Sequence, residues 1–287
     1  MRADESFRRE QKRPVCYHPP TMTSPAIEQA PPASYVIQGR EVRLPVEVRD
    51  ATAAVAFYLV SAAAAQRLID ASGLRIAQTL PGRALCTIGT MDYKDGDLGR
   101  YHEVAVSFFV RERGARAVPL AGTMLGLLRG TLGAYIHQLP VDGEFTCEAG
   151  QTIWGFPKFM AEISLTRDGD AETSVLTVDG EHVLTQSVRA GGYPERGRRA
   201  RPERSRRGGR SFGERAQISY AWRDGVLYRT PSVMSGEGVA ARLGGAALEL
   251  GTHPIAGELR SLGLPKRALF STYIGRMRAV FSAAERL

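Results

Sequence analysis

The chain has 287 residues, of which 43% are hydrophobic, 24% charged and 8% aromatic, so it can bury a core of ordinary size. The formal net charge is +8, but residues 196–210 alone carry eight arginines and one glutamate, which amounts to +7. The rest of the chain is nearly neutral, which argues against nucleic acid and against an anionic membrane surface as partners of the folded part.

Cysteine content and apolar stretches limit the class of protein further. Cys16, Cys86 and Cys147 are too few and too scattered for a disulfide framework, and no CxxC pair is present to hold a metal. The most apolar stretch, residues 51–65, is shorter than the ~20 residues that a membrane-spanning helix needs. The charged start of the chain runs into Pro14 without the apolar segment of a secretory signal. The sequence therefore predicts a cytoplasmic protein with no metal site and no membrane partner.

The first part of the chain divides into a tail and the start of a domain. Residues 1–33 are rich in charge and proline and lack apolar periodicity, so we expect a disordered N-terminal tail, followed by one domain over 34–287. Charged and apolar residues alternate over 41–48, which predicts a strand, and 54–60 is typical of a buried strand. Ser61 is a favourable N-cap for a helix over 62–69 that ends at Gly73.

The middle of the chain reads as a series of short strands. The turn-like 168–170 and the Asp-Gly pair at 179–180 separate some of them and indicate hairpins. A helix is predicted over 120–135, although it contains four glycines that each cost about 1 kcal/mol. The predicted strands lie at 84–90, 103–111, 152–154, 161–167, 173–178 and 182–189.

Residues 195–212 form a low-complexity, arginine-rich insert for which we expect a solvated loop. Its Arg-Gly-Gly-Arg end resembles a fragment of an RNA-binding repeat, and an RNA-binding role would predict salt-sensitive binding that is lost on deletion of 196–210. One such fragment inside an insert is weak support, so we predict no nucleic-acid partner.

Strands resume after the insert. Two are expected at 217–222 and 225–229, joined by a tight turn at 223–224, and a closing strand is expected at 272–281. The stretch 239–250 fits either a helix or an extended segment. No repeat of fixed period is present, which excludes a solenoid or propeller. The fold class predicted from this spacing is mainly antiparallel β with a few helices.

One lysine stands out chemically. Only four of the 38 basic residues are lysines, and Lys158 lies in the apolar sequence Ile-Trp-Gly-Phe-Pro-Lys-Phe-Met. An amine buried among apolar groups is poorly solvated, which lowers its pKa and leaves a nucleophilic free amine, as imine formation requires. The alternative from the residues alone is a strand-end lysine whose stem packs on Phe156 or Trp154 while its amine reaches water.

The histidines give no comparable signal. His102 and His137 lie near the chemically interesting segments, but they have no partners at metal-ligand spacing. A hydrogen-bonded structural role is expected for each.

Three segments carry a resemblance to a known family. Residues 150–158 (Gly-Gln-Thr-Ile-Trp-Gly-Phe-Pro-Lys), 101–103 (Tyr-His-Glu), and the stretch from His-Pro-Ile at 253–255 to Gly-Leu-Pro at 263–265 resemble the acetoacetate decarboxylase family, in particular its longer, actinobacterial-type members. The resemblance spans most of 35–287. It implies a closed barrel or cone-like sheet, assembly into a homo-oligomer and no cofactor.

The same resemblance implies roles for individual residues. Lys158 corresponds to the lysine that forms a Schiff base with the substrate ketone, and Glu103 to a carboxylate that orients substrate or moves protons. Without the resemblance, Glu103 would be read as a charged residue that opens a strand. Tyr101, Trp154 and Phe156 are the expected substrate-binding residues. The implied reaction is release of CO2 from a small β-keto acid through a Lys158 imine.

Two departures from the family pattern leave alternatives open. Clostridial-type members carry a second lysine after the imine-forming one, where this chain has Phe159, and they carry an arginine near the stretch that corresponds to 57–59, which here is Phe-Tyr-Leu. The alternatives are a Schiff-base aldolase-dehydratase that acts on pyruvate and an aldehyde, and a non-catalytic protein that binds a small acid in the same cavity.

Overall fold

The computed structural model describes residues 33–112, 132–190 and 210–287. The expected tail, most of the expected helix at 120–135 and most of the arginine-rich insert lie outside these residues. Within them, no helix is long and apolar enough to cross a membrane. The elements are β1 (Ser34–Ile37), β2 (Arg40–Arg43), β3 (Val46–Ser61), α1 (Ala62–Ile69), a short 3-10 helix (Asp70–Ser72), β4 (Arg75–Ile76), β5 (Gln78–Leu80), β6 (Arg83–Gly96), β7 (Tyr101–Arg111), β8 (Gly133–Val141), α3 (Glu144–Trp154), β9 (Lys158–Met160), β10 (Glu162–Asp168), β11 (Ala171–Val178), β12 (Glu181–Arg189), β13 (Arg210–Arg223), β14 (Val226–Leu243), β15 (Ala246–Leu250), α4 (Pro254–Ser261), β16 (Phe270–Phe281) and β17 (Glu285–Arg286).

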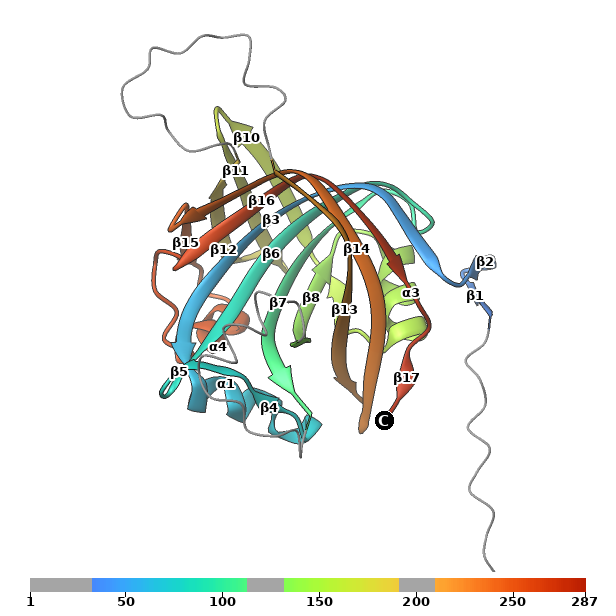
Figure 1. Cartoon of the computed structure of the whole chain (residues 1–287), viewed down its shortest axis with the longest axis horizontal. Coiled ribbons are helices and arrows are strands. Elements are labelled where there is room, and N and C mark those ends of the chain that lie inside the picture. The colour runs from blue at the N-terminus through green and yellow to red at the C-terminus, as the bar shows by residue number, and fades with distance from the viewer. Residues whose placement is uncertain (1–32, 113–131, 191–209) are drawn as a thin grey trace, which may run out of the picture. The chain divides into compact units, whose positions relative to one another are not determined.

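The main sheet closes into a barrel. Its strands follow the order β7-β6-β3-β16-β14-β13-β8, and a further pairing of β8 with β7 completes a ring of seven strands among the described residues. The neighbours in this ring are antiparallel except β13 and β8, which pair in parallel through Ser219 with Ala134 and Tyr220 with Tyr135. Figure 1 shows the strongly curved sheet with α3 beside β8 and β13. The predicted class of a closed, mainly antiparallel β fold with few helices is confirmed.

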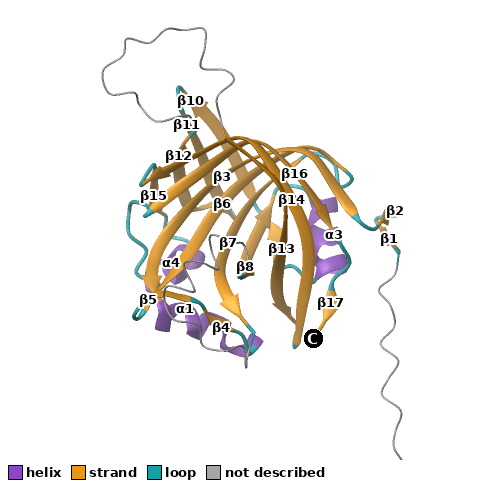
Figure 2. Ribbon diagram, viewed as in Figure 1, coloured by secondary structure: helices purple, strands orange, loops and turns teal. Residues whose placement is uncertain are grey.

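A second sheet of four strands, β10-β11-β12-β15, packs against the outer face of β3, β6 and β7. The two sheets share an apolar core and one buried hydrogen bond, in which Tyr58 Oη donates to Gln186 Oε1 at 3.0 Å. Figure 2 shows how few helices accompany these strands. The outer face of the central barrel strands is therefore covered, and their other face lines the barrel interior.

Several local predictions are confirmed by capping and turn geometry. Ser61 Oγ accepts a hydrogen bond from Ala64 N at 3.2 Å, and helix α1 spans 62–69 as expected. Asp179 and Gly180 have φ values of 51° and 77°, the left-handed pair that a two-residue hairpin turn requires. The turn between β13 and β14 lies at 224–225, one residue later than predicted.

Two predictions about element type are wrong. Residues 152–154 form the last turn of α3 and not a strand, because Ala149 and Ile153 lie one turn apart on a helix face that is buried in the core. This packing overrides the strand preference of the individual residues. The expected helix at 120–135 is also wrong at its end, since 133–135 begin β8. The open choice at 239–250 resolves as extended, in β14 and β15.

Candidate functional site

Lys158 is the first residue of β9, which pairs in parallel with β8 through Lys158 and Leu139. Its backbone N–H donates to Phe156 O at 2.8 Å, and its carbonyl accepts from Gln151 Nε2 at 2.6 Å. The side chain is 3% exposed. The lysine is thus held at both backbone groups and buried, which decides against the alternative of an amine that reaches water.

Two polar side chains bind the lysine amine. Nζ lies 2.8 Å from Glu103 Oε2 and donates to Thr146 Oγ1 at 3.0 Å. It also lies 4.9 Å from the centre of the Tyr101 ring, within the range of a cation–π contact. The structure therefore brings together Lys158, Glu103 and Tyr101, three of the residues singled out from the sequence.

The carboxylate of Glu103 is held from its other side. Tyr93 Oη donates to Glu103 Oε1 at 3.1 Å, and the rings of Tyr93 and Tyr101 stack with centroids 4.3 Å apart. Burial is the main cause that raises the pKa of both phenols, so they are neutral donors at physiological pH. Each Glu103 oxygen therefore has a defined partner, one of them the lysine.

The electrostatics of Lys158 differ from the sequence-based expectation. Burial lowers the pKa of its amine, but the carboxylate of Glu103, the phenol of Tyr101 and the thiol of Cys147 raise it, and the net pKa is above the usual lysine value. The predicted low pKa is thus wrong for this structure. The apolar neighbours in the sequence gave no indication that a carboxylate 55 positions earlier would lie within an ion-pair distance.

Helix α3 packs against the aliphatic part of the Lys158 side chain. It carries Thr146 and Cys147, and Gly150 faces the aliphatic part of the Lys158 side chain. The helix ends at Gly155, whose φ of 63° allows the chain to reverse towards β9. Burial raises the pKa of the Cys147 thiol although the charges of Lys158 and Arg223 oppose it. One short helix therefore positions the stem and one hydrogen-bond partner of the amine.

Trp154 and Phe156, the other two expected substrate-binding residues, lie in a core cluster beside α3. Their rings stack 5.7 Å apart, Trp154 also contacts Phe281, and Trp154 Nε1 donates to Ser282 O at 2.8 Å. Both side chains are buried. Their observed contacts fix the end of α3 and the loop to β9, while Tyr101 is the aromatic residue against the lysine amine.

The structure shows where the residues at the two departures from the family pattern lie in the barrel. Phe159 packs against the core on the outer side of the barrel, because consecutive strand residues face opposite sides. Tyr58 is fully buried in that same core and bonded to Gln186. Phe159 and Tyr58 therefore contribute to the packing between the two sheets. Leu59, which stands where clostridial-type members carry a charged residue, is half-buried on the opposite, inner face of β3, the face of Val55 and Phe57.

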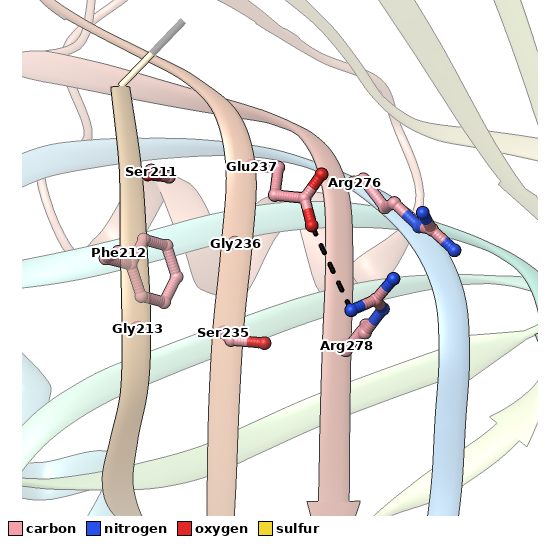
Figure 3. Close-up of a pocket in the computed structure, with 8 residues that line it drawn as sticks. All are labelled: Ser211, Phe212, Gly213, Ser235, Gly236, Glu237, Arg276 and Arg278. Carbon is pink, nitrogen blue, oxygen red and sulfur yellow. Dashed lines mark ion pairs between the residues drawn. The ribbon is translucent and has the colours of Figure 1, made fainter.

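A separate pocket lies on the surface of β13, β14 and β16, with a volume of about 380 Å³ (Figure 3). Its charged residues are matched by opposite charges: Arg278 lies 3.9 Å from Glu237, and Arg276 lies 3.9 Å from Asp50. Neither Lys158 nor Glu103 lines it. It is therefore not part of the lysine site.

The histidines are paired with acids in the structure. His102 Nδ1 lies 2.6 Å from Asp142 Oδ2, and His137 Nε2 lies 2.7 Å from Glu258 Oε1. Over residues 33–112, 132–190 and 210–287, no cluster of three or more His, Cys, Asp or Glu side chains is arranged to hold a metal ion. The structural role expected for these two histidines agrees with these contacts.

Three residues of the site were missed from the sequence. Tyr93 lies in a polar stretch with no motif, and Thr146 lies in the unrecognised first part of α3. Gly150 belongs to the segment that carries the family resemblance, and its spacing of eight residues before Lys158 was the available signal. Recognition of α3 as a helix would have placed Thr146 and Gly150 one turn apart on one face.

Comparisons with known proteins agree with this arrangement. The model of the acetoacetate decarboxylase family matches residues 22–282. The solved acetoacetate decarboxylase of Legionella pneumophila is 14% identical, with a TM-score of 0.56 over 93% of this chain and 92% of that one. Another solved acetoacetate decarboxylase is 18% identical, with a TM-score of 0.57 over 86% of this chain and 90% of that one.

A third similar structure is the enduracididine biosynthesis enzyme MppR in complex with pyruvate, at 14% identity and a TM-score of 0.53 over 90% of this chain and 91% of that one. Among curated protein sequences, none matches. At these identities the solved structures show a shared fold. The match of the family model over most of the chain shows that this protein belongs to the acetoacetate decarboxylase family.

Proposed function

We propose that this protein is a carboxy-lyase in which Lys158 forms a Schiff base with a β-keto acid and releases CO2. The observation that carries the proposal is the contact of a buried lysine amine with a buried carboxylate, Glu103, at 2.8 Å. The pair provides a nucleophile and, beside it, a group that can take and return its proton. Family membership supports the same chemistry.

The first stage forms the iminium. The raised pKa of Lys158 means that the resting amine is an ammonium, so its proton moves to Glu103 as the substrate ketone approaches. The free amine adds to the ketone carbon, the ketone oxygen takes up two protons in all and leaves as water, and a protonated imine remains. Thr146 Oγ1 and the Tyr101 ring hold Nζ in position during this exchange.

The second stage breaks the carbon–carbon bond. The electron pair of the bond to the carboxylate flows into the iminium, CO2 leaves, and an enamine forms. Glu103, a carboxylate again once water has left, takes up one proton from solvent and delivers it to the enamine carbon. Water then hydrolyses the new iminium to the ketone and Lys158. The balance is one β-keto acid anion and one proton converted to one ketone and one CO2. The half-buried, apolar Val55 and Met91 of the inner wall near Glu103 disfavour a carboxylate and favour neutral CO2.

Reductive trapping tests the proposal. The protein is incubated with acetoacetate or with pyruvate, reduced with borohydride and analysed by intact mass and peptide mapping. Lys158→Ala is the test variant, and Lys266→Met, which changes an exposed lysine, is the matched control. We expect an adduct on Lys158 in the wild type and the control, and CO2 release from acetoacetate.

The outcomes separate the candidate functions. An adduct with pyruvate alone, without CO2 release from any β-keto acid, would support aldolase-dehydratase chemistry and overturn the decarboxylase assignment. The absence of an adduct with either compound would contradict imine chemistry and favour a binding protein. Light scattering of the same preparation tests the homo-oligomer that the family resemblance predicts.

A further inference from the structure

The inner face of the barrel beyond Glu103 is lined by small residues. Side chains at alternate positions of a strand share a face, so Ala105 follows Glu103 on the inner side of β7. Its partner on β6 is Gly89, and the partner of Gly89 on β3 is Val55. These three residues form a belt that runs across the middle of the sheet next to the lysine pair.

Exposure is higher on part of this inner face than on the outer face. On the outer side of the same strands, the side chains under the second sheet are 0–2% exposed: Ala54, Ala56, Ile88, Val104 and Val106. On the inner side, Val55, Met91 and Ala105 are only half-buried, although they occupy the central strands β3, β6 and β7. Central strands keep such exposure only where the space before them is open.

The far end of this open space is aromatic. Phe57 stacks on Phe270 with centroids 4.1 Å apart and lies parallel to Phe109 at 6.4 Å. All three rings are half-buried. Between them and the belt, the hydroxyls of Thr87 and Ser107 bind each other at 2.5 Å and leave little unpaired polarity. Ser107 lies four residues beyond Glu103, roughly 13 Å along the strand.

The inner face is therefore polar at the lysine pair and, apart from the paired hydroxyls of Thr87 and Ser107, apolar for roughly 13 Å along the strand, which is longer than acetoacetate. We infer that the substrate is an elongated β-keto acid, with its ketone at Lys158 and an apolar acyl chain that passes the belt of Val55, Gly89 and Ala105 towards Phe57, Phe109 and Phe270. This inference rests on the proposed imine chemistry for the reacting end. The chain itself is recognised by burial of its methylene groups, each of which raises kcat/KM about fourfold.

The experiment compares CO2 release from acetoacetate and from β-oxooctanoate. Wild type is expected to favour the longer acid by about 250-fold in kcat/KM, since four more methylenes are buried. In Ala105→Phe the ratio of the two kcat/KM values is expected to fall to near one, because the ring blocks the belt. Ala247→Phe, which adds the same ring at an exposed position of β15, is expected to keep the wild-type ratio. Equal kcat/KM values in wild type, or an unchanged ratio in Ala105→Phe, would overturn the inference.

Octanoate binding, measured by calorimetry, separates this inference from the proposed function. Octanoate has the chain but no ketone, and it is expected to bind to the wild type and Ala247→Phe but not to Ala105→Phe. If neither keto acid reacts and octanoate still binds in this pattern, imine chemistry fails and the chain site stands. If octanoate binds to none of the three proteins, or to all equally, the chain site is overturned. Ala105→Leu replaces Ala105→Phe if the larger ring prevents folding.

Discussion

Gly150 and Lys158 fit together because Gly150 has no side chain. A Cβ added at Gly150 would lie 2.5 Å from Lys158 Cδ and 2.7 Å from Lys158 Cε, closer than real Cβ contacts occur. The lysine stem therefore crosses the backbone of α3 directly. This close approach aims Nζ at Glu103 and Thr146.

The first prediction concerns Gly150→Ala. The methyl group must displace the lysine stem, and a shift of about 1 Å at a reacting atom can lower the rate on the order of 100-fold. We expect reductive trapping and CO2 release to fall by such a factor while the circular dichroism spectrum stays unchanged. Gly257→Ala is the control, since Gly257 also lies in a helix and has open space at its Cβ position. Equal rates in both variants would contradict the role of Gly150.

The second prediction concerns the pH dependence of Lys158. In Glu103→Gln the largest cause that raises the pKa of Lys158 is removed while burial, which lowers it, remains. The pKa of the amine should fall, so acylation of Lys158 by an activated ester should reach half its maximum rate at a lower pH. CO2 release should drop, because the group that accepts and returns the proton is lost.

Glu148→Gln, on the exposed side of α3, is the control for this change and should leave the acylation profile of the wild type in place. A Glu103→Gln profile that moves to higher pH would show that Glu103 does not stabilise the ammonium form.

The third prediction concerns stability. Lys158→Met leaves the buried carboxylate of Glu103 without its cation, which is expected to cost about 3–5 kcal/mol in the free energy of unfolding. The double variant Lys158→Met/Glu103→Gln removes both charges and should recover part of that loss. Urea unfolding of the wild type, both single variants and the double variant gives the coupling; strictly additive losses would argue against a direct pair.

The Lys158–Glu103 pair also determines how the free energy of unfolding changes at alkaline pH. The pKa of Lys158 is raised in the folded protein above its usual value of 10.5. The stabilisation is therefore complete below that usual value and is lost as pH rises through the raised one. The stability gap between wild type and Lys158→Met should narrow in that alkaline range.

The fourth prediction separates a positioning tyrosine from a structural one. Tyr93→Phe removes the hydrogen bond to Glu103 and should alter the pH profile of Lys158 acylation, with a cost in stability of about 1.5–3 kcal/mol for a bond to a charged group. Tyr58→Phe removes the bond to Gln186 between the two sheets and should lower stability without moving the profile. Identical profiles in both variants would assign Tyr93 a packing role alone.

Local signals in the sequence predicted local structure well. The Ser61 cap and the Asp-Gly turn each depend on a few consecutive residues, and the structure confirms them. The single strand predicted over 41–48 is wrong at its centre, because β2 ends at Arg43 and β3 begins at Val46. Helix α3 was not predicted, because its amphipathic face is short and its last turn has β-forming residues. Its helical state depends on contacts with strands distant in the chain, which no local pattern reports.

The candidate site was also predicted only in part, because local patterns do not report contacts between residues distant in the chain. Lys158 and Glu103 were both identified, but the pKa direction of Lys158 was not, because it depends on the 2.8 Å distance between two residues on different strands. Tyr93 was not identified from the sequence for the same reason. It lies at the site because it pairs with Tyr101 across β6 and β7.

The parallel pairing of β8 and β13 follows from the parity of the ring. Antiparallel neighbours alternate in direction, so a closed ring with an odd number of strands must contain at least one parallel pair. Here that pair has two residues on each strand, and the other end of β8 pairs with Lys158 through Leu139. Strand β8 therefore forms one side of the parallel pair that closes the barrel and also pairs with β9, the strand that carries Lys158. Amide hydrogens of the short β8–β13 pair are expected to exchange with solvent before those of β3 and β6. Local opening of that pair would affect Lys158 first, because β8 pairs with the lysine strand.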